Sequence, residues 1–383
     1  MDSRLPVLFI VLTVAIDAMG IGLIMPVMPA LLEEIGGGTV AQAAVWGRLL
    51  SASFAVMQFL SAPLLGALSD RFGRQPVLVS LVAMAVDYAV MALAHTMGLL
   101  LLARLIGGVT AATHSTANAY MADISAPHQK GARFRAGGGR VRRRFRLGPV
   151  LGGVLADYGT RAPFWAAGAL ALGNAALGFF VLRETVTDAI RRRFDPARAN
   201  PFGAFRAVAR LAGLRRLISV LFLFQFATMV YPAVWAYFLT ERFAWSGTMI
   251  GLSLGLYGFF YALVMGLLVR PVIARAGHRG TVIIGLGFEI ASLLILGFIA
   301  NGTLLLAVIP VAALGSLALP ALQAEIGQAV ADDAQGELQG VLTSAASVAM
   351  IAAPLVMTQT FAVFTRAGAQ PICRARPSCW RWG

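Results

Sequence analysis

Long apolar runs recur along almost the whole chain, and they constrain its fold more than any other feature. Each run covers roughly 20 residues, the length that an α-helix needs to cross the hydrocarbon core of a bilayer. Of the 383 residues, 58% are hydrophobic and 13% are charged, whereas an average soluble domain has about 25% charged residues. Alternating segments of about ten residues, typical of outer-membrane barrels, are absent from the sequence. The sequence therefore predicts an all-α polytopic membrane protein.

The apolar runs are expected to form two helix bundles, which are separated in the sequence by a polar loop. The N-terminal run is interpreted as a retained first span, because it carries Asp17 and lacks a small-residue cleavage site. The expected domains are residues 1–182, a central cytoplasmic loop at 183–216, and residues 217–383. The expected spans are Leu5–Met28, Leu49–Ser69, Val77–Ala94, Met97–Tyr120, Pro163–Leu182, Leu217–Leu239, Ile250–Ala274, Val282–Ala300, Leu304–Leu322 and Leu338–Phe364.

The net charge is +14, and most of the basic residues lie in loops, where they indicate how the chain is oriented in the membrane. Arginine and lysine gather in alternate loops, as cytoplasmic loops do, and the opposite loops are acidic or mixed. We therefore expect both termini of a complete chain to be cytoplasmic, and no nucleic-acid partner. The basic loops contain Arg71 and Arg74, Lys130 and Arg133, residues 191–193, and Arg275 and Arg279, whereas the opposite loops contain Glu33 and Glu34, Asp157 and Arg161, Glu241 and Arg242, and Asn301.

The segment Gly66–Pro76, GALSDRFGRQP, is a short charged turn between two apolar runs. Gly73 permits a positive φ where one helix ends, and Pro76 suits the start of the next helix. Asp70 can pair with an arginine such as Arg71 or Arg74 and face the positive end of a neighbouring helix. Read by its residues alone, the segment is a charged turn that ends one helix and starts the next.

The segment 270–280 occupies the corresponding loop of the second half. It keeps Arg275, Gly277 and Arg279 but lacks the aspartate. A degenerate second copy is expected of a protein built from two related six-helix repeats.

The segment 131–146, GARFRAGGGRVRRRFR, interrupts the place where a fifth span is expected. It contains seven arginines in sixteen residues, and each arginine at the centre of a span costs about 2.5–3.5 kcal/mol on insertion. The segment is either an unusually basic loop beside a short re-entrant helix or the product of a local frame shift in a GC-rich gene. Residues 366–383 show the same composition where a twelfth span is expected, so the prediction is twelve spans with the fifth damaged and the last missing.

Charged side chains inside apolar spans are costly and are candidates for function. Asp17, in the first span, is surrounded by Gly20, Gly22 and Pro26, which interrupt helix regularity. A desolvated carboxyl group of this kind can exchange protons, although it can also serve as a structural hydrogen-bonding group. Asp87 has the same two interpretations, and Glu289 is the one acid deep in the second half of the sequence.

Arg104 is either a partner for one of these carboxylates or an interfacial residue whose head group reaches towards water. Gln58, Asn118 and Gln225 are polar intramembrane residues that can bind substrate or hold helices together. Gly148, Pro149, Gly152 and Gly153 allow close helix approach and bending. The two cysteines and four histidines show no metal-ligand spacing, and no catalytic arrangement or phosphate loop is recognisable, so we expect neither an enzyme nor a resident cofactor.

Several of these motifs together resemble one family. The Gly66–Pro76 loop resembles the latch between the second and third helices of the major facilitator superfamily, and Gly148–Gly153 resembles part of its antiporter signature. More specifically, the chain resembles the tetracycline efflux proteins of Gram-negative bacteria. The motifs are residues 17–26 (DAMGIGLIMP), the Gly66–Pro76 loop, Asp87–Tyr88, residues 241–245 (ERFAW), 319–323 (LPALQ) and 335–340 (QGELQG).

The resemblance implies a major facilitator fold of two six-helix halves and exchange of a divalent-metal–tetracycline complex for a proton. Mg²⁺ enters as part of the substrate, and the protein is implied to be a monomer in the bacterial inner membrane. Asp17, Asp87 and Arg104 are implied to line the first-half pathway, the latch is implied to include Asp70, Arg71 and Arg74, and Glu289 is implied to be the coupling acid. Tyr261 stands where many relatives carry histidine.

Three functions remain open from the sequence. The first is proton-coupled export of tetracycline, for which competition between a cationic complex and a proton at membrane carboxylates is a sufficient basis. The second is export of another drug or metabolite, which the departure at Tyr261 favours. The third is a frame-damaged membrane protein that does not transport.

Overall fold

The structure, a computed structural model, describes most of the helical part of the chain. The described residues are 22–37, 39–72, 76–110, 147–181, 214–329 and 335–365, with a few single positions of the first span. Every regular element in these ranges is helical. The first half contains α2 (Met28–Gly36), α3 (Val40–Phe72), α4 (Pro76–Leu93), α5 (Met97–Thr110), α8 (Leu147–Ala156) and α9 (Ala162–Val181).

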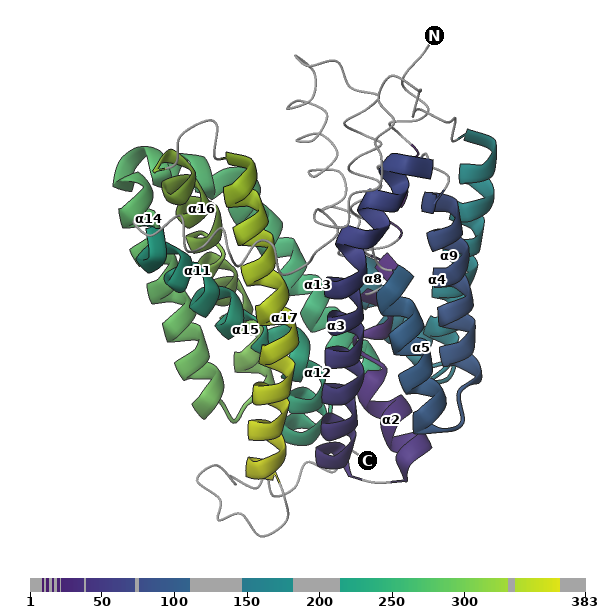
Figure 1. Ribbon diagram of the computed structural model, residues 1–383. Helices are drawn as coiled ribbons and strands as arrows, with labels where there is room; N and C mark the ends of the chain where they lie inside the picture. The colour runs from purple at the N-terminus through teal and green to yellow at the C-terminus, as the bar shows by residue number, and fades with distance from the viewer. Residues whose placement is uncertain are drawn as a thin grey trace.

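The second half continues with a similar set of long helices on the other side of the molecule (Figure 1). Each half has apolar core clusters of its own. The elements are α11 (Arg215–Thr228), α12 (Val230–Phe243), α13 (Gly247–Leu263), η2 (Val264–Leu268), α14 (Val269–Phe298), α15 (Gly302–Gly315), α16 (Ala318–Gln328) and α17 (Gln335–Thr365).

Local sequence signals set several helix ends at the turns predicted to be extracytoplasmic. Gly37, with φ 61°, terminates α2 in the left-handed conformation and donates its N–H to the Glu33 carbonyl. Ser246 caps α13 by accepting a hydrogen bond from the Met249 N–H. Asn301 caps α15 by accepting from the Thr303 and Leu304 N–H groups.

Where the expected spans fall on described residues they agree with the helices, with four differences in detail. The second helix, α3, begins at Val40 rather than at Leu49, so it extends well beyond the apolar run. The expected spans 7 and 10 are each divided, at Met229 and at Ser316–Leu317. Span 8 contains the π-helical turn η2, and the loop before span 9 is reduced to a kink at Gly277, with φ 70°.

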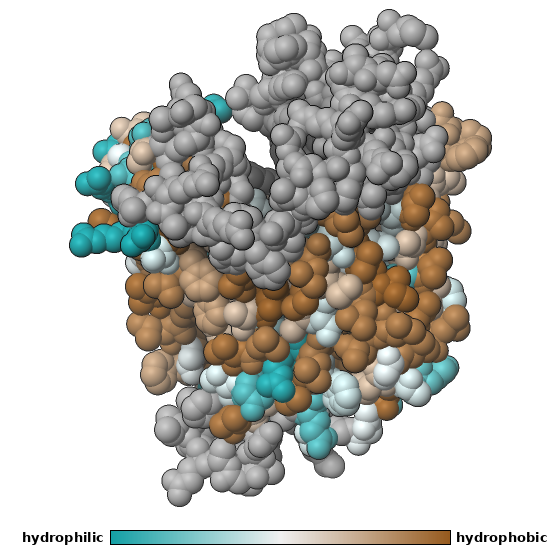
Figure 2. Space-filling view, in the orientation of Figure 1, coloured by the Kyte–Doolittle hydropathy of each residue, from teal (hydrophilic) through white to brown (hydrophobic). Residues whose placement is uncertain are grey.

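The outer surface of the described helices is apolar, as a lipid-facing surface must be. Figure 2 shows a broad hydrophobic band across the middle of the face in view. Large apolar side chains of the described helices are well exposed, among them Phe180 at 82% and Phe298 at 76%. Six helical segments of the described chain are long and apolar enough to cross a membrane.

Two helix pairs make the main contact between the halves. α3 packs along α17, and α8 packs along α13; Figure 1 shows α3 and α17 side by side at the boundary. These four helices form most of the seam between the two bundles, and α12 adds to it by packing against α2 and α3.

Several sequence predictions lie outside the described residues. They concern Asp17, Asn118, the arginine-rich segment 131–146, most of the central loop and residues 366–383. In the predicted latch, the backbone of residues 66–72 is the last part of α3 and α4 begins at Pro76, but its side chains and residues 73–75 are not described.

Candidate functional site

A buried ion pair marks the centre of the first half. The Arg104 guanidinium on α5 donates a hydrogen bond to Asp87 Oδ2 on α4 at 2.6 Å. Asp87 is 3% exposed and Arg104 is 13% exposed, and the guanidinium carbon lies 5.2 Å from the centre of the Phe54 ring. Of the two interpretations of Arg104, the structure shows the partner of a carboxylate.

The ion pair retains unused hydrogen-bonding capacity. Asp87 Oδ1 and Arg104 Nε are buried, and neither makes a hydrogen bond within the described chain. Such groups are costly to leave unpaired away from water. They are therefore available to a polar ligand that enters this part of the bundle.

Glycines provide the space for the Asp87 side chain and its neighbour. A Cβ atom added to Gly107 would lie 2.7 Å from Asp87 Oδ2, and one added to Gly20 would lie 2.6 Å from the Tyr88 hydroxyl. The close contact of α4 with α5 therefore depends on glycine at position 107, opposite Asp87.

A second buried acid lies at a related place in the second half. Glu289 on α14 is 5% exposed, and a Cβ atom added to Gly315 on α15 would lie 2.3 Å from its Oε2. Each half therefore packs a buried carboxylate against a glycine of the next helix. Only Asp87 has a basic partner: within the described residues, no arginine, lysine or histidine forms an ion pair with Glu289.

Tyrosines surround Glu289 instead. The Tyr231 hydroxyl faces the carboxylate, and Tyr257 interacts with it electrostatically. The Tyr231 and Tyr257 rings stack with centroids 6.1 Å apart, and Tyr257 and Tyr261 are also 6.1 Å apart. The predicted residue Tyr261 is thus one end of a row of three tyrosines that leads to Glu289.

The other predicted polar residues are less closely connected. Gln58 and Gln225 are half-buried, and the structure assigns neither of them to the ion pair or to the tyrosine row. Their roles as substrate ligands stay predictions.

The predicted antiporter motif lies at the seam between the halves. Gly148 packs on the backbone of Gly22, and Gly152 packs on the backbone of Leu23, both in the first half. On its other side, Gly153 approaches the backbone of Gly247 and Thr248 at the start of α13. All four motif residues are buried, and they place α8 between the first span and α13.

Polar contacts join the halves near the turns predicted to be extracytoplasmic. The Thr248 hydroxyl donates to Asp157 Oδ2 at 2.6 Å, and the Gly153 carbonyl, at 3.1 Å, is a second acceptor within its reach. Arg48 on α3 donates a hydrogen bond to Gln359 on α17. In this conformation the two halves are therefore held together at their outer ends.

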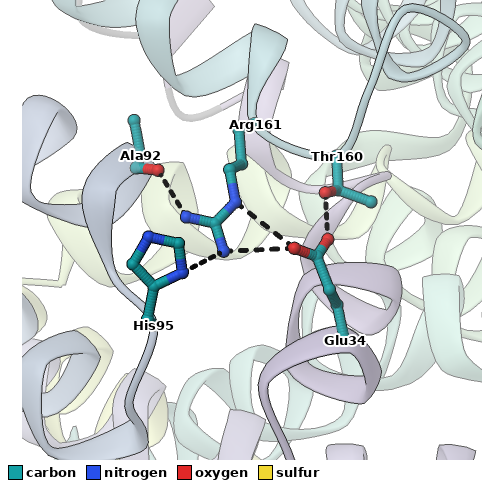
Figure 3. Close-up of polar contacts among 5 residues, drawn as sticks. All are labelled: Glu34, Ala92, His95, Thr160 and Arg161. Carbon is teal, nitrogen blue, oxygen red and sulfur yellow. Dashed lines mark hydrogen bonds and ion pairs between the residues drawn. The ribbon is translucent and has the colours of Figure 1, made fainter.

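A further polar cluster connects three outer turns of the first half (Figure 3). Arg161 donates to the Ala92 carbonyl at 2.9 Å and to Glu34 Oε1 at 3.1 Å, and it lies 3.2 Å from His95 Nδ1. The Thr160 hydroxyl donates to the second oxygen of Glu34. The ends of α2, α4 and the α8–α9 turn are thus fixed to one another.

The two acids near the end of α2 have pKa values that are shifted in opposite directions by their surroundings. The hydrogen bond from Thr160, followed by those from Arg161, lowers the pKa of Glu34. Partial burial, followed by repulsion from Glu241 of the second half, raises the pKa of Glu33. Glu33 Oε1 is buried without a hydrogen bond within the described chain.

Sequence reasoning did not identify Tyr231, Tyr257, Gly107 or Gly315. The spacing of Tyr257 and Tyr261, four residues apart, was a usable signal because it places both rings on one helix face. Nothing in the sequence indicates that the two glycines lie opposite buried acids, because that contact is between neighbouring helices.

Comparisons with known proteins identify the family. The sequence profile described as Major Facilitator Superfamily matches residues 10–231 and 216–383. The chain is 39% identical to "Tetracycline resistance protein, class C" of Escherichia coli, over 94% of this chain and 91% of that protein. It is 36% identical to the class G protein of Vibrio anguillarum, over 91% of this chain and 88% of that protein.

Solved structures agree with this assignment. The crystal structure of the human organic anion transporter MFSD10 has a TM-score of 0.69 at 26% identity and covers 97% of this chain and 96% of its own. A bacterial homologue of the lysosomal transporter Spinster has a TM-score of 0.75 at 18% identity, covering 95% of this chain and 84% of its own, and supports the fold alone. The chain is thus a membrane transporter rather than an enzyme, and it belongs to the major facilitator superfamily, in the group of the tetracycline resistance proteins.

Proposed function

We propose that this protein is an antiporter that exports a complex of tetracycline with a divalent cation in exchange for a proton. It would act as a monomer in the bacterial inner membrane and confer resistance to the drug. The observation that carries the proposal is similarity along nearly the full chain to several proteins named for tetracycline resistance. In this proposal Mg²⁺ is part of the transported substrate, and the protein has no resident cofactor.

The arrangement of the buried acids supports an exchange mechanism. Asp87 and Glu289 lie one in each half, so a movement of the halves about their seam changes the access of both carboxylates. A cationic complex and a proton compete for such groups, and competition at an alternately exposed site is sufficient for antiport. We infer that Asp87 and Arg104, with Asp17 of the first span, contribute to the substrate site.

Glu289 is proposed to be the acid that carries the proton. Asp87 has a guanidinium partner at 2.6 Å that stabilises its charge, whereas Glu289 has no such partner within the described chain. An acid without a fixed cation gains more from binding a proton in an apolar environment. The latch residues Gly66, Asp70, Arg71, Gly73 and Arg74 are proposed to control the cytoplasmic end of the pathway.

The test is tetracycline accumulation in susceptible cells that express this chain. We expect low accumulation in cells with the unmodified protein. Accumulation should rise to the level of cells that lack the protein when the proton gradient is collapsed, and it should reach the same level in cells that express Asp87→Asn or Glu289→Gln. Asp188→Asn, an acid-to-amide change in the polar central segment, is the matched control and should keep accumulation low. Each variant must be present in the membrane at the level of the unmodified protein.

Export of another drug or metabolite is the second candidate, and the tyrosine at position 261 favours it. If the protein reaches the membrane but leaves tetracycline accumulation unchanged, resistance to a panel of other antibiotics would decide for this candidate. If it does not reach the membrane, restoring a regular apolar fifth span at 131–146 would test whether that segment prevents folding.

A further inference from the structure

The environment of Glu289 differs from that of Asp87 in the first half. The carboxylate is buried against Gly315 and lacks a basic partner within the described chain. A charged carboxylate in such a place requires hydrogen-bond donors to persist at all. The donor must come from a neighbouring helix.

Few ionisable groups of the described chain lie near Glu289. α14 packs against α15, α16 and η2, and α15 and η2 contain no charged residue. The acid of α16, Glu325, is engaged with Arg279 at 2.8 Å. The ionisable groups that do interact with Glu289 come from two other helices, Tyr231 of α12 and Tyr257 of α13.

Tyr231 is the better placed of the two. Its hydroxyl approaches the carboxylate, yet neither that hydroxyl nor Glu289 Oε1 completes a well-formed hydrogen bond within the described chain. The Tyr231 ring also borders an apolar cavity lined by Trp235, Tyr257 and Ile309. The cavity gives the ring room to move, so the hydroxyl can reach the carboxylate or withdraw from it.

We propose that Tyr231 is a positioning residue for Glu289. Its hydroxyl donates a hydrogen bond to the carboxylate while Glu289 is charged, and it turns away when a proton from the membrane exterior binds there. Tyr231 keeps its own proton throughout. The inference deepens the proposed proton coupling and rests on it for its role in transport, but the contact itself can be tested without substrate.

Stacking with Tyr257 explains how the movement of Tyr231 is transmitted. The two rings lie nearly parallel, with an interplanar angle of 24°, and Tyr231 also packs against Trp235 at 5.9 Å. Trp235 is fixed to α13 by a hydrogen bond from Nε1 to Ser253 Oγ at 3.0 Å. A movement of the Tyr231 ring that exceeds the cavity would therefore press on α13, which packs along α8 at the seam.

The first experiment uses infrared difference spectroscopy on the purified, substrate-free protein during a pH titration. The carboxyl bands of Glu289 are assigned by their loss in Glu289→Gln. We expect Tyr231→Phe to change the frequency and the pH profile of these bands. Tyr237→Phe is the matched control, because its hydroxyl lies on the same helix but faces Gly47. Unchanged bands in Tyr231→Phe, or equal changes in both variants, would overturn the proposal.

The second experiment separates this inference from the proposed function. In proteoliposomes, uptake of tetracycline driven by a pH gradient is compared with counterflow exchange in the absence of a gradient. We expect Tyr231→Phe to lower the maximal driven rate about tenfold, the size expected for loss of a hydrogen bond to a charged group, with little change in KM. Counterflow should persist, and Tyr231→Phe should add no further loss to Glu289→Gln.

The outcomes are distinguishable. If the unmodified protein drives no tetracycline uptake while the infrared bands respond as expected, the proposed substrate or coupling is wrong and the contact between Tyr231 and Glu289 stands. Normal driven uptake in Tyr231→Phe would show that Tyr231 does not act through Glu289. An equal loss of counterflow from Tyr231→Phe in the unmodified protein and in the Glu289→Gln background would show the same.

Discussion

The guanidinium of Arg104 and the carboxylate of Asp87 form a 2.6 Å ion pair inside the first helical bundle. The pair joins consecutive helices, α4 and α5, and is shielded from water on nearly all sides. Its charges differ in accessibility, because Asp87 is more deeply buried than Arg104. This difference predicts unequal consequences when either partner is removed.

Arg104→Leu should destabilise the protein more than Asp87→Asn. Loss of the arginine leaves an unpaired carboxylate in an apolar interior, for which the expected cost is about 3–5 kcal/mol. Loss of the carboxylate leaves a guanidinium that can move its head group towards water. Chemical unfolding in detergent would compare the two, and the double variant should be more stable than Arg104→Leu alone. Equal losses in both single variants would contradict this reasoning.

Gly107→Ala should destabilise the protein and impair transport, whereas Gly98→Ala should do neither. The two glycines lie on the same helix, α5. A Cβ at position 107 would lie 2.7 Å from Asp87 Oδ2, but one at position 98 would have no atom within 4 Å. Overpacking of this kind costs about 1–3 kcal/mol. Thermal unfolding of both variants, followed by a transport assay, provides the comparison.

A covalent link between residues 157 and 248 should trap the halves with their outer ends closed. The Thr248 hydroxyl and Asp157 Oδ2 are 2.6 Å apart across the seam. In a background where Cys373 and Cys379 are replaced by serine, Asp157→Cys with Thr248→Cys should react with a short bifunctional thiol reagent and lose transport. Cleavage of a reducible linker should restore it. Full activity of the cross-linked protein would show that this contact does not open during transport.

The stability contributed by Thr160 should depend on pH. The pKa of Glu34 is lowered by the Thr160 hydrogen bond and then by Arg161, so the folded protein binds a proton there less readily than the unfolded chain. The contribution is therefore present above the ordinary glutamate pKa and disappears as pH falls through the lower folded value. Thr160→Val should lower the melting temperature near pH 7, but not at about pH 3. Thr240→Val, whose hydroxyl bonds only the Ala236 carbonyl within the described chain, should show no such pH dependence.

The sequence was sufficient to predict the fold class because the main constraint, a series of apolar runs of membrane length, is local. It also identified Asp87, Arg104 and Glu289, since a charge within an apolar run is visible without a structure. The breaks at Met229 and Ser316–Leu317 were missed, because hydrophobicity continues across both. A local signal was present at each, since Pro232 and Pro320 follow within a few residues and a proline removes a backbone hydrogen bond from the preceding turn.

The surroundings of each acid were not predictable for a related reason. The positions of Tyr231 and Gly315 beside Glu289 depend on the relative rotation of three helices, and periodicity within one helix does not determine that rotation. The sequence gives no pairing for Asp157 and Thr248 either, since these residues are separated by 91 positions.

The seam between α8 and α13 has an energetic consequence for the transport cycle. It is formed largely by backbone atoms, because Gly153 and Gly251 meet there with Pro149 and Gly247. Ordering a long side chain costs up to about 2 kcal/mol in rotamer entropy, whereas glycine and proline incur almost none. Parting and rejoining this surface therefore changes side-chain entropy very little. The cost of separating the halves along α8 and α13 falls mainly on the polar contact of Thr248 with Asp157 at the outer end.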